Sequence, residues 1–171
     1  SLGLVGSEMC IRDRYNIKHQ NKHKLDLVDE ILSNVDVIPN SIVLAQAAIE
    51  SGWGKSRFAK EYNALFGEYT YDDSEGVIPL ERENGDTHLI KAFSSYSNSV
   101  ESYFDNINSH YAYEDFRDIR NIMRKRNNFS NVNLLVNKLS TYAEDENYIK
   151  TIRQVIKTNN FTIFDQKTIS Y

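Results

Sequence analysis

The sequence contains one cysteine, two prolines, seven glycines and no long apolar run. Because Cys10 has no second cysteine to pair with, the chain cannot be held together by an internal disulfide framework. A membrane-spanning helix needs about 18 or more predominantly apolar residues, so we expect no membrane span in this chain. The scarcity of helix-breaking residues favours a helix-rich fold with short loops. A net charge of −4 argues against a nucleic-acid-binding surface.

What is present is typical of one soluble globular domain. The chain has 171 residues, of which 40% are hydrophobic and 26% are charged. The four histidines of the chain are His19, His23, His88 and His110. They show no ligand-like spacing on one helix face, so we expect no metal site and no cofactor. Nothing in the sequence points to an oligomer, and we expect a monomer.

The first 14 residues differ in character from the rest. Residues 1–14 lack a basic start followed by a sustained apolar stretch, which makes them a poor secretory signal. They look like translated sequencing-adapter read-through, so we interpret them as a non-native extension and residues 15–171 as the domain. The native N-terminus is then expected to be missing, and the lack of a signal does not locate the protein.

Helical periodicity dominates the chain on both sides of residues 66–93. Apolar residues from Leu25 to Val35 predict a helix that ends before Pro39. The next helix, 41–50, is apolar on nearly every face, which is typical of a buried helix. Further helices are expected at 56–62, at 98–110 with Ser97 as the cap, and at 114–126, 131–142 and 145–158. The pattern after Phe161 is ambiguous.

Residues 66–93 have β character. Tyr69 to Tyr71 favour a strand, 72–76 read as a loop, and 77–82 and 87–93 flank Asn84-Gly85, a strong hairpin signal. The predicted fold is therefore α+β and mostly α, a helical domain with a small β-hairpin lobe.

Glu50 is the one ionisable residue of the apolar 41–50 helix, and it lies in the last turn before Gly52. Loss of water and the negative end of the helix dipole both disfavour a carboxylate there, so both would raise its pKa. A carboxylic acid that is still protonated near neutral pH can donate a proton to a departing sugar oxygen. The alternative is a structural acid paired with Lys55 or Arg57.

Two motifs near this acid resemble a known family. Ala45 to Gly54 ends in Glu-Ser-Gly-Trp-Gly, and 63–67 read Asn-Ala-Leu-Phe-Gly. Together they resemble the peptidoglycan-cleaving glucosaminidase domain of flagellar and autolysin-type β-N-acetylglucosaminidases, most closely the Bax-type bacterial proteins. The likeness continues through Ala92 to Tyr96 and Ser99 to Tyr103, and spans about residues 24–160. Ala64 departs from it, because many members have Asn directly before Leu-Phe-Gly.

The resemblance implies a lysozyme-like fold and a glycosidase that cleaves the β-1,4 glycan strands of peptidoglycan after N-acetylglucosamine. It also implies an extracytoplasmic location, in the periplasm or cell envelope. Glu50 would be the general acid. A muramidase, a lytic transglycosylase or a non-catalytic glycan-binding domain are the alternatives.

A second carboxylate is expected on the hairpin. If Asn84-Gly85 forms a two-residue turn, Glu81 lies opposite His88, and Glu81 and Glu83 point to the same face. The flagellar members of the family carry a functional glutamate at the position of Glu81. We take Glu81 as the group that activates water or stabilises the oxocarbenium-like transition state, with Glu83 as the second choice. Three alternatives stay open for the second carboxylate. It could be Glu68 or Glu75, the hairpin charges could be solvated without a catalytic role, or the substrate's own N-acetyl group could attack in its place.

The resemblance also implies substrate contacts near Glu50. They involve Trp53, a side-chain amide or backbone group in the Asn63 to Gly67 stretch, and a Tyr103 hydroxyl that faces the cleft. Without the resemblance, Phe66 and Tyr103 would be interpreted as core residues.

Overall fold

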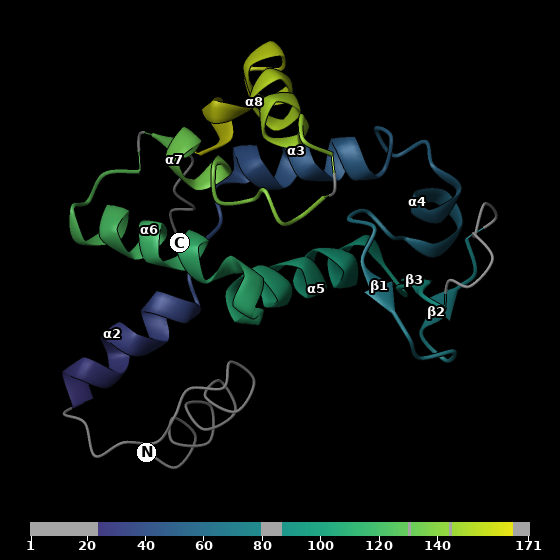
Figure 1. Cartoon of the computed structure of the whole chain (residues 1–171), viewed down its shortest axis with the longest axis horizontal. Helices are drawn as coiled ribbons and strands as arrows, with labels where there is room; N and C mark the ends of the chain where they lie inside the picture. Colours follow the sequence, from purple (N-terminus) through teal and green to yellow (C-terminus); the bar gives the residue numbers. More distant parts are fainter. Residues whose placement is uncertain (1–23, 80–86, 130, 144, 166–171) are drawn as a thin grey trace. The chain divides into compact units, whose positions relative to one another are not determined.

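The computed structural model describes residues 24–79, 87–129, 131–143 and 145–165 (Figure 1). The elements in chain order are α2 (Lys24–Asn34), α3 (Asn40–Glu50), α4 (Arg57–Tyr62), β1 (Tyr69–Thr70), β2 (Gly76–Val77), β3 (Leu89–Lys91), α5 (Tyr96–Ser109), η1 (Tyr111–Tyr113), α6 (Glu114–Lys125), α7 (Val132–Val136), α8 (Tyr148–Thr158) and η2 (Phe161–Phe164). This order confirms the predicted fold class, mostly α with a small antiparallel sheet.

The described chain forms two compact units. One contains the residues up to Ile38 together with Asp105–Arg153, and the other contains Pro39–Phe104 together with the chain from Gln154 onward. Glu50 and both motifs near it lie in the second unit. Within the described residues, no helix is both long enough and apolar enough to span a membrane.

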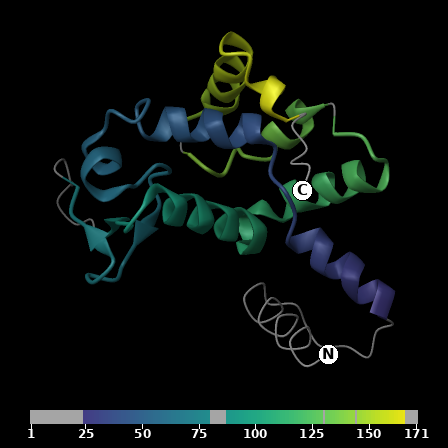
Figure 2. The same cartoon turned by 180° about the vertical axis from the view of Figure 1, so that it is seen from behind.

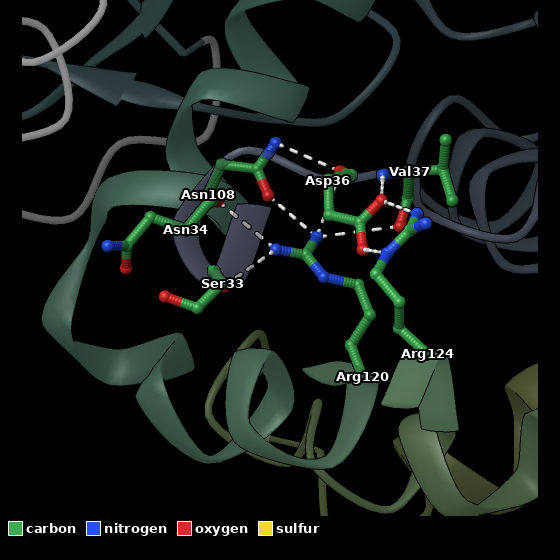
Figure 3. Close-up of polar contacts among 7 residues, drawn as sticks. All are labelled: Ser33, Asn34, Asp36, Val37, Asn108, Arg120 and Arg124. Atoms are coloured by element: carbon green, nitrogen blue, oxygen red, sulfur yellow. Dashed lines mark hydrogen bonds and ion pairs between the residues drawn. The ribbon is translucent and has the colours of Figure 1, made fainter. Parts of the chain in front are cut away.

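In the first unit, a buried cluster of polar groups joins α2 to α5 and α6 (Figure 3). Arg120 is fully buried on α6 and donates to the backbone carbonyls of Ser33 and Asn34 at the end of α2, and to Oδ1 of Asn108 on α5 at 2.7 Å. Burial lowers the pKa of Arg120 to about 10. Arg124 binds both carboxylate oxygens of Asp36, and this bond raises the pKa of Arg124. The carbonyls left unpaired at the end of α2 are thus satisfied by a side chain distant in sequence.

In the second unit, α3 begins at a proline that offers no side-chain cap. Asp165, directly after η2, supplies the missing group, because its Oδ1 accepts from the Ser41 backbone N–H at 2.8 Å. Asn40 donates from its side chain to the Phe164 carbonyl at 2.9 Å. A carboxylate at a helix N-terminus is favourable by about 0.3–1 kcal/mol, and here it also ties the C-terminal segment to α3.

The helix carrying Glu50 is less buried than its sequence predicted. Ile42, Ala45 and Gln46 have no exposed surface, yet the Leu44 side chain is 39% exposed. The expectation of burial on every face is therefore wrong. The helix has one buried stripe and an outer apolar face.

The sheet has the order β1-β3-β2, and both pairs are antiparallel. Figures 1 and 2 show the three strands together beside α4 and the first turns of α5. An uninterrupted ladder from a two-residue turn at Asn84-Gly85 would place Val77 opposite Ala92, whereas the structure places it opposite Ile90. The turn itself lies outside the described residues.

Three predicted boundaries are corrected. The cap of α5 is Ser95, whose Oγ accepts from the Asn98 N–H at 3.2 Å, so the helix begins two residues earlier than Ser97 implied. Of the strand predicted at 77–82, the described residues 77–79 form a strand only at Val77, because Pro79 cannot donate to a ladder, and residues 80–82 lie outside the described residues. The 131–142 helix stops at Val136, after which the backbone continues in three-residue turns such as Leu139 N–H to the Val136 carbonyl.

Candidate active site

Glu50 is the last residue of α3, as predicted, and is half-buried. The helix is closed behind it by backbone bonds from the Ser51 N–H to the Ala47 carbonyl and from the Trp53 N–H to the Ala48 carbonyl at 2.7 Å. Ser51 also uses its hydroxyl, which donates to the Ala47 carbonyl and accepts from the Gly54 N–H at 2.8 Å. The chain thus reverses immediately after Glu50, and these hydrogen bonds fix the backbone at the C-terminal end of α3.

The reversal runs through three successive left-handed residues. Gly52, Trp53 and Gly54 have φ of 56°, 59° and 71°. Glycine adopts these angles without strain, whereas a residue with a Cβ is disfavoured there by about 1–2 kcal/mol. The Trp53 side chain is 56% exposed, and its ring centroid is 6.4 Å from that of Phe161. A bulky aromatic held exposed in an unfavourable conformation next to the predicted acid is typical of a functional position.

Gly67 lies against the Glu50 carboxylate. A Cβ built on Gly67 would be 3.6 Å from Oε2 of Glu50, and the φ of Gly67 is 61°. The 63–67 motif therefore passes close to the acid at Gly67, a proximity that the two motifs do not reveal in the sequence.

One face of α5 holds the chain around Gly67. The Ser99 hydroxyl accepts from the Leu65 N–H at 3.1 Å, and the Tyr103 ring stacks on Phe66 with centroids 4.2 Å apart. The Ser102 hydroxyl donates to Oε2 of Glu68 at 2.7 Å. Because residues three and four apart lie on the same helix face, these α5 side chains all contact the 65–68 segment from one side.

Tyr103 and Phe66 lie in the core. Tyr103 has no exposed surface and donates from its hydroxyl to Oε1 of Gln46 at 2.6 Å, and Phe66 is 2% exposed. Gln46 lies one turn before Glu50 on the same helix face. The Tyr103 hydroxyl is therefore directed towards the helix that carries the acid, and the interpretation of both rings as core residues fits this burial.

The Asn63 side chain holds the turn after α4. Its amide donates to the Phe93 carbonyl at 2.9 Å, and its backbone is left-handed at φ 53°. Asparagine is among the few residues that tolerate this conformation. A contact between this amide and substrate stays a prediction.

Arg57 was one candidate partner for Glu50. Its guanidinium donates to the Ile78 carbonyl at 3.2 Å, lies 3.8 Å from the Glu61 carboxylate, and stacks over the Phe58 ring. Lys55, the other candidate, is exposed.

Glu68, which the sequence left as one of several candidates for the second carboxylate, lies next in the chain to Gly67, the residue close to Glu50. This carboxylate is half-buried and is held by Ser102 on α5. The sequence signal was its place after Leu-Phe-Gly. Its partner lies 34 residues away, which no local pattern reveals.

Glu81 and Glu83 lie outside the described residues, and their roles stay predictions. In the part of the chain that the structure describes, no group of three or more His, Cys, Asp or Glu residues could hold a metal ion.

Three comparisons relate this geometry to known proteins. The family model described as mannosyl-glycoprotein endo-beta-N-acetylglucosaminidase matches residues 25–161. The Bax protein of Escherichia coli K12 is 34% identical over 133 residues, which cover 78% of this chain and 47% of Bax. The peptidoglycan hydrolase FlgJ of the same strain is 35% identical over 92 residues, 48% of this chain and 29% of FlgJ. The chain thus spans half or less of the length of these relatives.

A solved structure shares the fold. The catalytic domain of the autolysin Auto from Listeria monocytogenes superposes with a TM-score of 0.57 at 19% identity, over 92% of this chain and 97% of that domain. At this identity the likeness shows the fold alone. The family match covers most of the chain, including Glu50 and both motifs. The chain therefore belongs to the glucosaminidase family of glycosidases.

Proposed function

We propose that this protein cleaves the β-1,4 glycan strands of bacterial peptidoglycan as an endo-β-N-acetylglucosaminidase, with Glu50 as the general acid. The observation that carries the proposal is the position of Glu50, half-buried at the end of α3 against the Gly67 backbone and beside the exposed Trp53. A carboxyl group in such surroundings can retain its proton until it meets a glycosidic oxygen.

In this reaction Glu50 gives its proton to O4 of the leaving sugar as the bond from C1 of N-acetylglucosamine breaks. A water oxygen bonds to C1, and its proton passes to a second carboxylate. We assign that carboxylate to Glu81, with Glu83 as the second choice. The reaction needs neither a metal nor a cofactor.

The substrate contacts extend from Glu50 along the two motifs. The exposed Trp53 indole offers a face on which a sugar ring can stack. Asn63 and the Phe66-Gly67 step are the further proposed contacts, with backbone groups at Gly67 available to an N-acetyl group. Tyr103 acts from within the core, by holding Gln46 on the face of α3 that ends at Glu50.

The relatives named above include the peptidoglycan hydrolase FlgJ, which supports peptidoglycan as the substrate and action outside the cytoplasm, in the periplasm or cell envelope. We further propose that the protein acts as a monomer and that residues 1–14 take no part in its function.

Digestion of purified peptidoglycan, followed by mass spectrometry of the new reducing ends, tests the proposal. A reducing N-acetylglucosamine end is expected. A reducing muramic acid end would identify a muramidase, and an anhydro-muramic end a lytic transglycosylase. Retained glycan binding without any cleavage would identify a non-catalytic binding domain.

A further inference from the structure

Glu68 is held in place from two directions. Its backbone carbonyl accepts from the Lys91 N–H on β3 at 2.8 Å, and its side-chain Oε2 accepts from the Ser102 hydroxyl on α5 at 2.7 Å. Its other carboxylate oxygen, Oε1, is buried. A half-buried carboxylate that is anchored at both its backbone and its side chain has few other positions to adopt.

A cation completes this network. The Lys91 ammonium group donates to the same Ser102 hydroxyl at 3.3 Å, so the hydroxyl bridges a positive and a negative group. Lys91 also lies over the Phe93 ring, 5.6 Å from its centroid. Glu68 and Lys91, joined through the Ser102 hydroxyl on α5, therefore form a charge pair, and Glu68 directly follows Gly67, the residue that lies close to Glu50.

Several other ionisable side chains are carried by the elements that pack here. On α5, Tyr103 donates its hydroxyl to Gln46, and Glu101 is exposed. In the chain after Glu50, Lys55 is exposed, and Arg57 is directed to the Ile78 carbonyl and to Glu61. Glu68 differs from them because it is a half-buried acid next in sequence to Gly67, whose Cβ position lies 3.6 Å from Oε2 of Glu50.

We propose that Glu68 is a positioning residue that acts through Glu50: its fixed negative charge favours the protonated form of the general acid, and Lys91 sets how strong that influence is. This inference rests on the proposed function of Glu50. A like charge nearby disfavours ionisation of a carboxyl group, so Glu68 raises the pH up to which Glu50 can still donate a proton, and Lys91 opposes that effect.

The test is the pH profile of glycan cleavage in two single variants. Glu68→Gln keeps the size of the side chain and an oxygen that accepts from Ser102, but removes the charge. We expect the alkaline limb of kcat/KM to move down by about half a pH unit, with about a threefold loss above the limb and none well below it. Lys91→Gln is expected to move the limb in the opposite direction.

Asp73→Asn is the matched control. Asp73 is an exposed acid of the same lobe, so its substitution changes the net charge equally. Its shift is expected to be less than half of that caused by Glu68→Gln. Equal shifts in the two variants would mean that only net charge matters, and would overturn the proposal.

A direct titration separates this proposal from the proposed function. The Glu50 side-chain carboxyl can be followed by carbon-13 NMR in uniformly labelled protein, with Glu50→Gln used to assign the signal. A lower Glu50 pKa in Glu68→Gln supports the proposal even if no glycan is cleaved, in which case only the enzymatic assignment fails.

Three results would overturn the proposal. The first is an unchanged Glu50 titration in folded Glu68→Gln. The second is loss of cleavage at every pH in that variant with its fold intact, which would make Glu68 a directly catalytic residue. The third applies if Glu68→Gln does not fold. The Glu50 titration is then measured in Lys91→Gln, and an unchanged Glu50 pKa in that variant would overturn the proposal.

Discussion

A carbon atom added at the Cβ position of Gly67 would lie 3.6 Å from Oε2 of Glu50, so these two residues are close neighbours in the fold. That distance is an ordinary van der Waals contact. A methyl group would therefore fit there but would cover one side of the acid. The last glycine of one motif thus shapes the surroundings of the acid in the other.

Gly67→Ala is expected to lower cleavage more than tenfold, which corresponds to about 1.4 kcal/mol of barrier, because the methyl group covers the proton donor on one side. The alanine would also adopt a left-handed φ, which destabilises the fold by about 1–2 kcal/mol. Gly54→Ala separates the two effects, since Gly54 has φ 71° and open space around its Cβ position. Kinetics and urea unfolding of both variants are the measurements. Equal activity loss in both would rule out a specific role for the Gly67 contact.

Glu50→Gln is expected to abolish hydrolysis while folding and glycan binding persist. The amide has nearly the same shape as the carboxyl group but has no acidic proton to donate. Release of soluble fragments from peptidoglycan, a pull-down with insoluble peptidoglycan and thermal unfolding measure the three properties. Glu61→Gln is the control, because that side chain is 58% exposed and one turn into the next helix, and it should keep full activity. Full activity in Glu50→Gln would refute the assignment of the acid.

Glu81→Gln is expected to reduce kcat by more than tenfold if Glu81 activates the attacking water. Glu83→Gln, two residues along the same predicted strand, is its matched comparison and should have the smaller effect. Single-turnover kinetics on a defined glycan oligomer would compare the two. A larger loss in Glu83→Gln would exchange their roles, and small losses in both would favour attack by the substrate's N-acetyl group.

Tyr103→Phe is expected to destabilise the protein by about 1–3 kcal/mol, because Gln46 has no exposed surface and would lose a buried hydrogen-bond donor. Urea unfolding measures the loss. Tyr96→Phe on the same helix is the control, since the Tyr96 side chain is 48% exposed and should change stability little. If both variants are equally stable, the Tyr103 hydroxyl does not hold Gln46 in solution.

Helices and helix ends that depend on neighbouring residues were the features that the sequence predicted well. The periodicity from Leu25 to Val35 gave the helix α2, and Gly52 marked the end of the helix that carries Glu50. Predictions failed where neighbouring residues offered equal choices. Ser95 and Ser97 are both good caps, and the register of Val77 depended on a turn seven residues away. The prediction that Leu44 is buried was wrong, because an apolar pattern does not reveal which side of a helix the rest of the chain covers.

The sequence by itself determined which acid ends an apolar helix, which residues can turn left-handed behind it, and the family to which the chain belongs. The first two depend on residues within a few positions of one another, and the family follows from motifs that the sequence displays directly along residues 25–161. Only the tertiary structure decided that Gly67 meets Glu50, that Ser102 and Lys91 hold Glu68, and that Tyr103 is directed to Gln46. These pairs lie around the buried and stacked rings of Tyr103 and Phe66. Hydrophobic burial is non-directional, so the local pattern of residues does not specify which partners it joins.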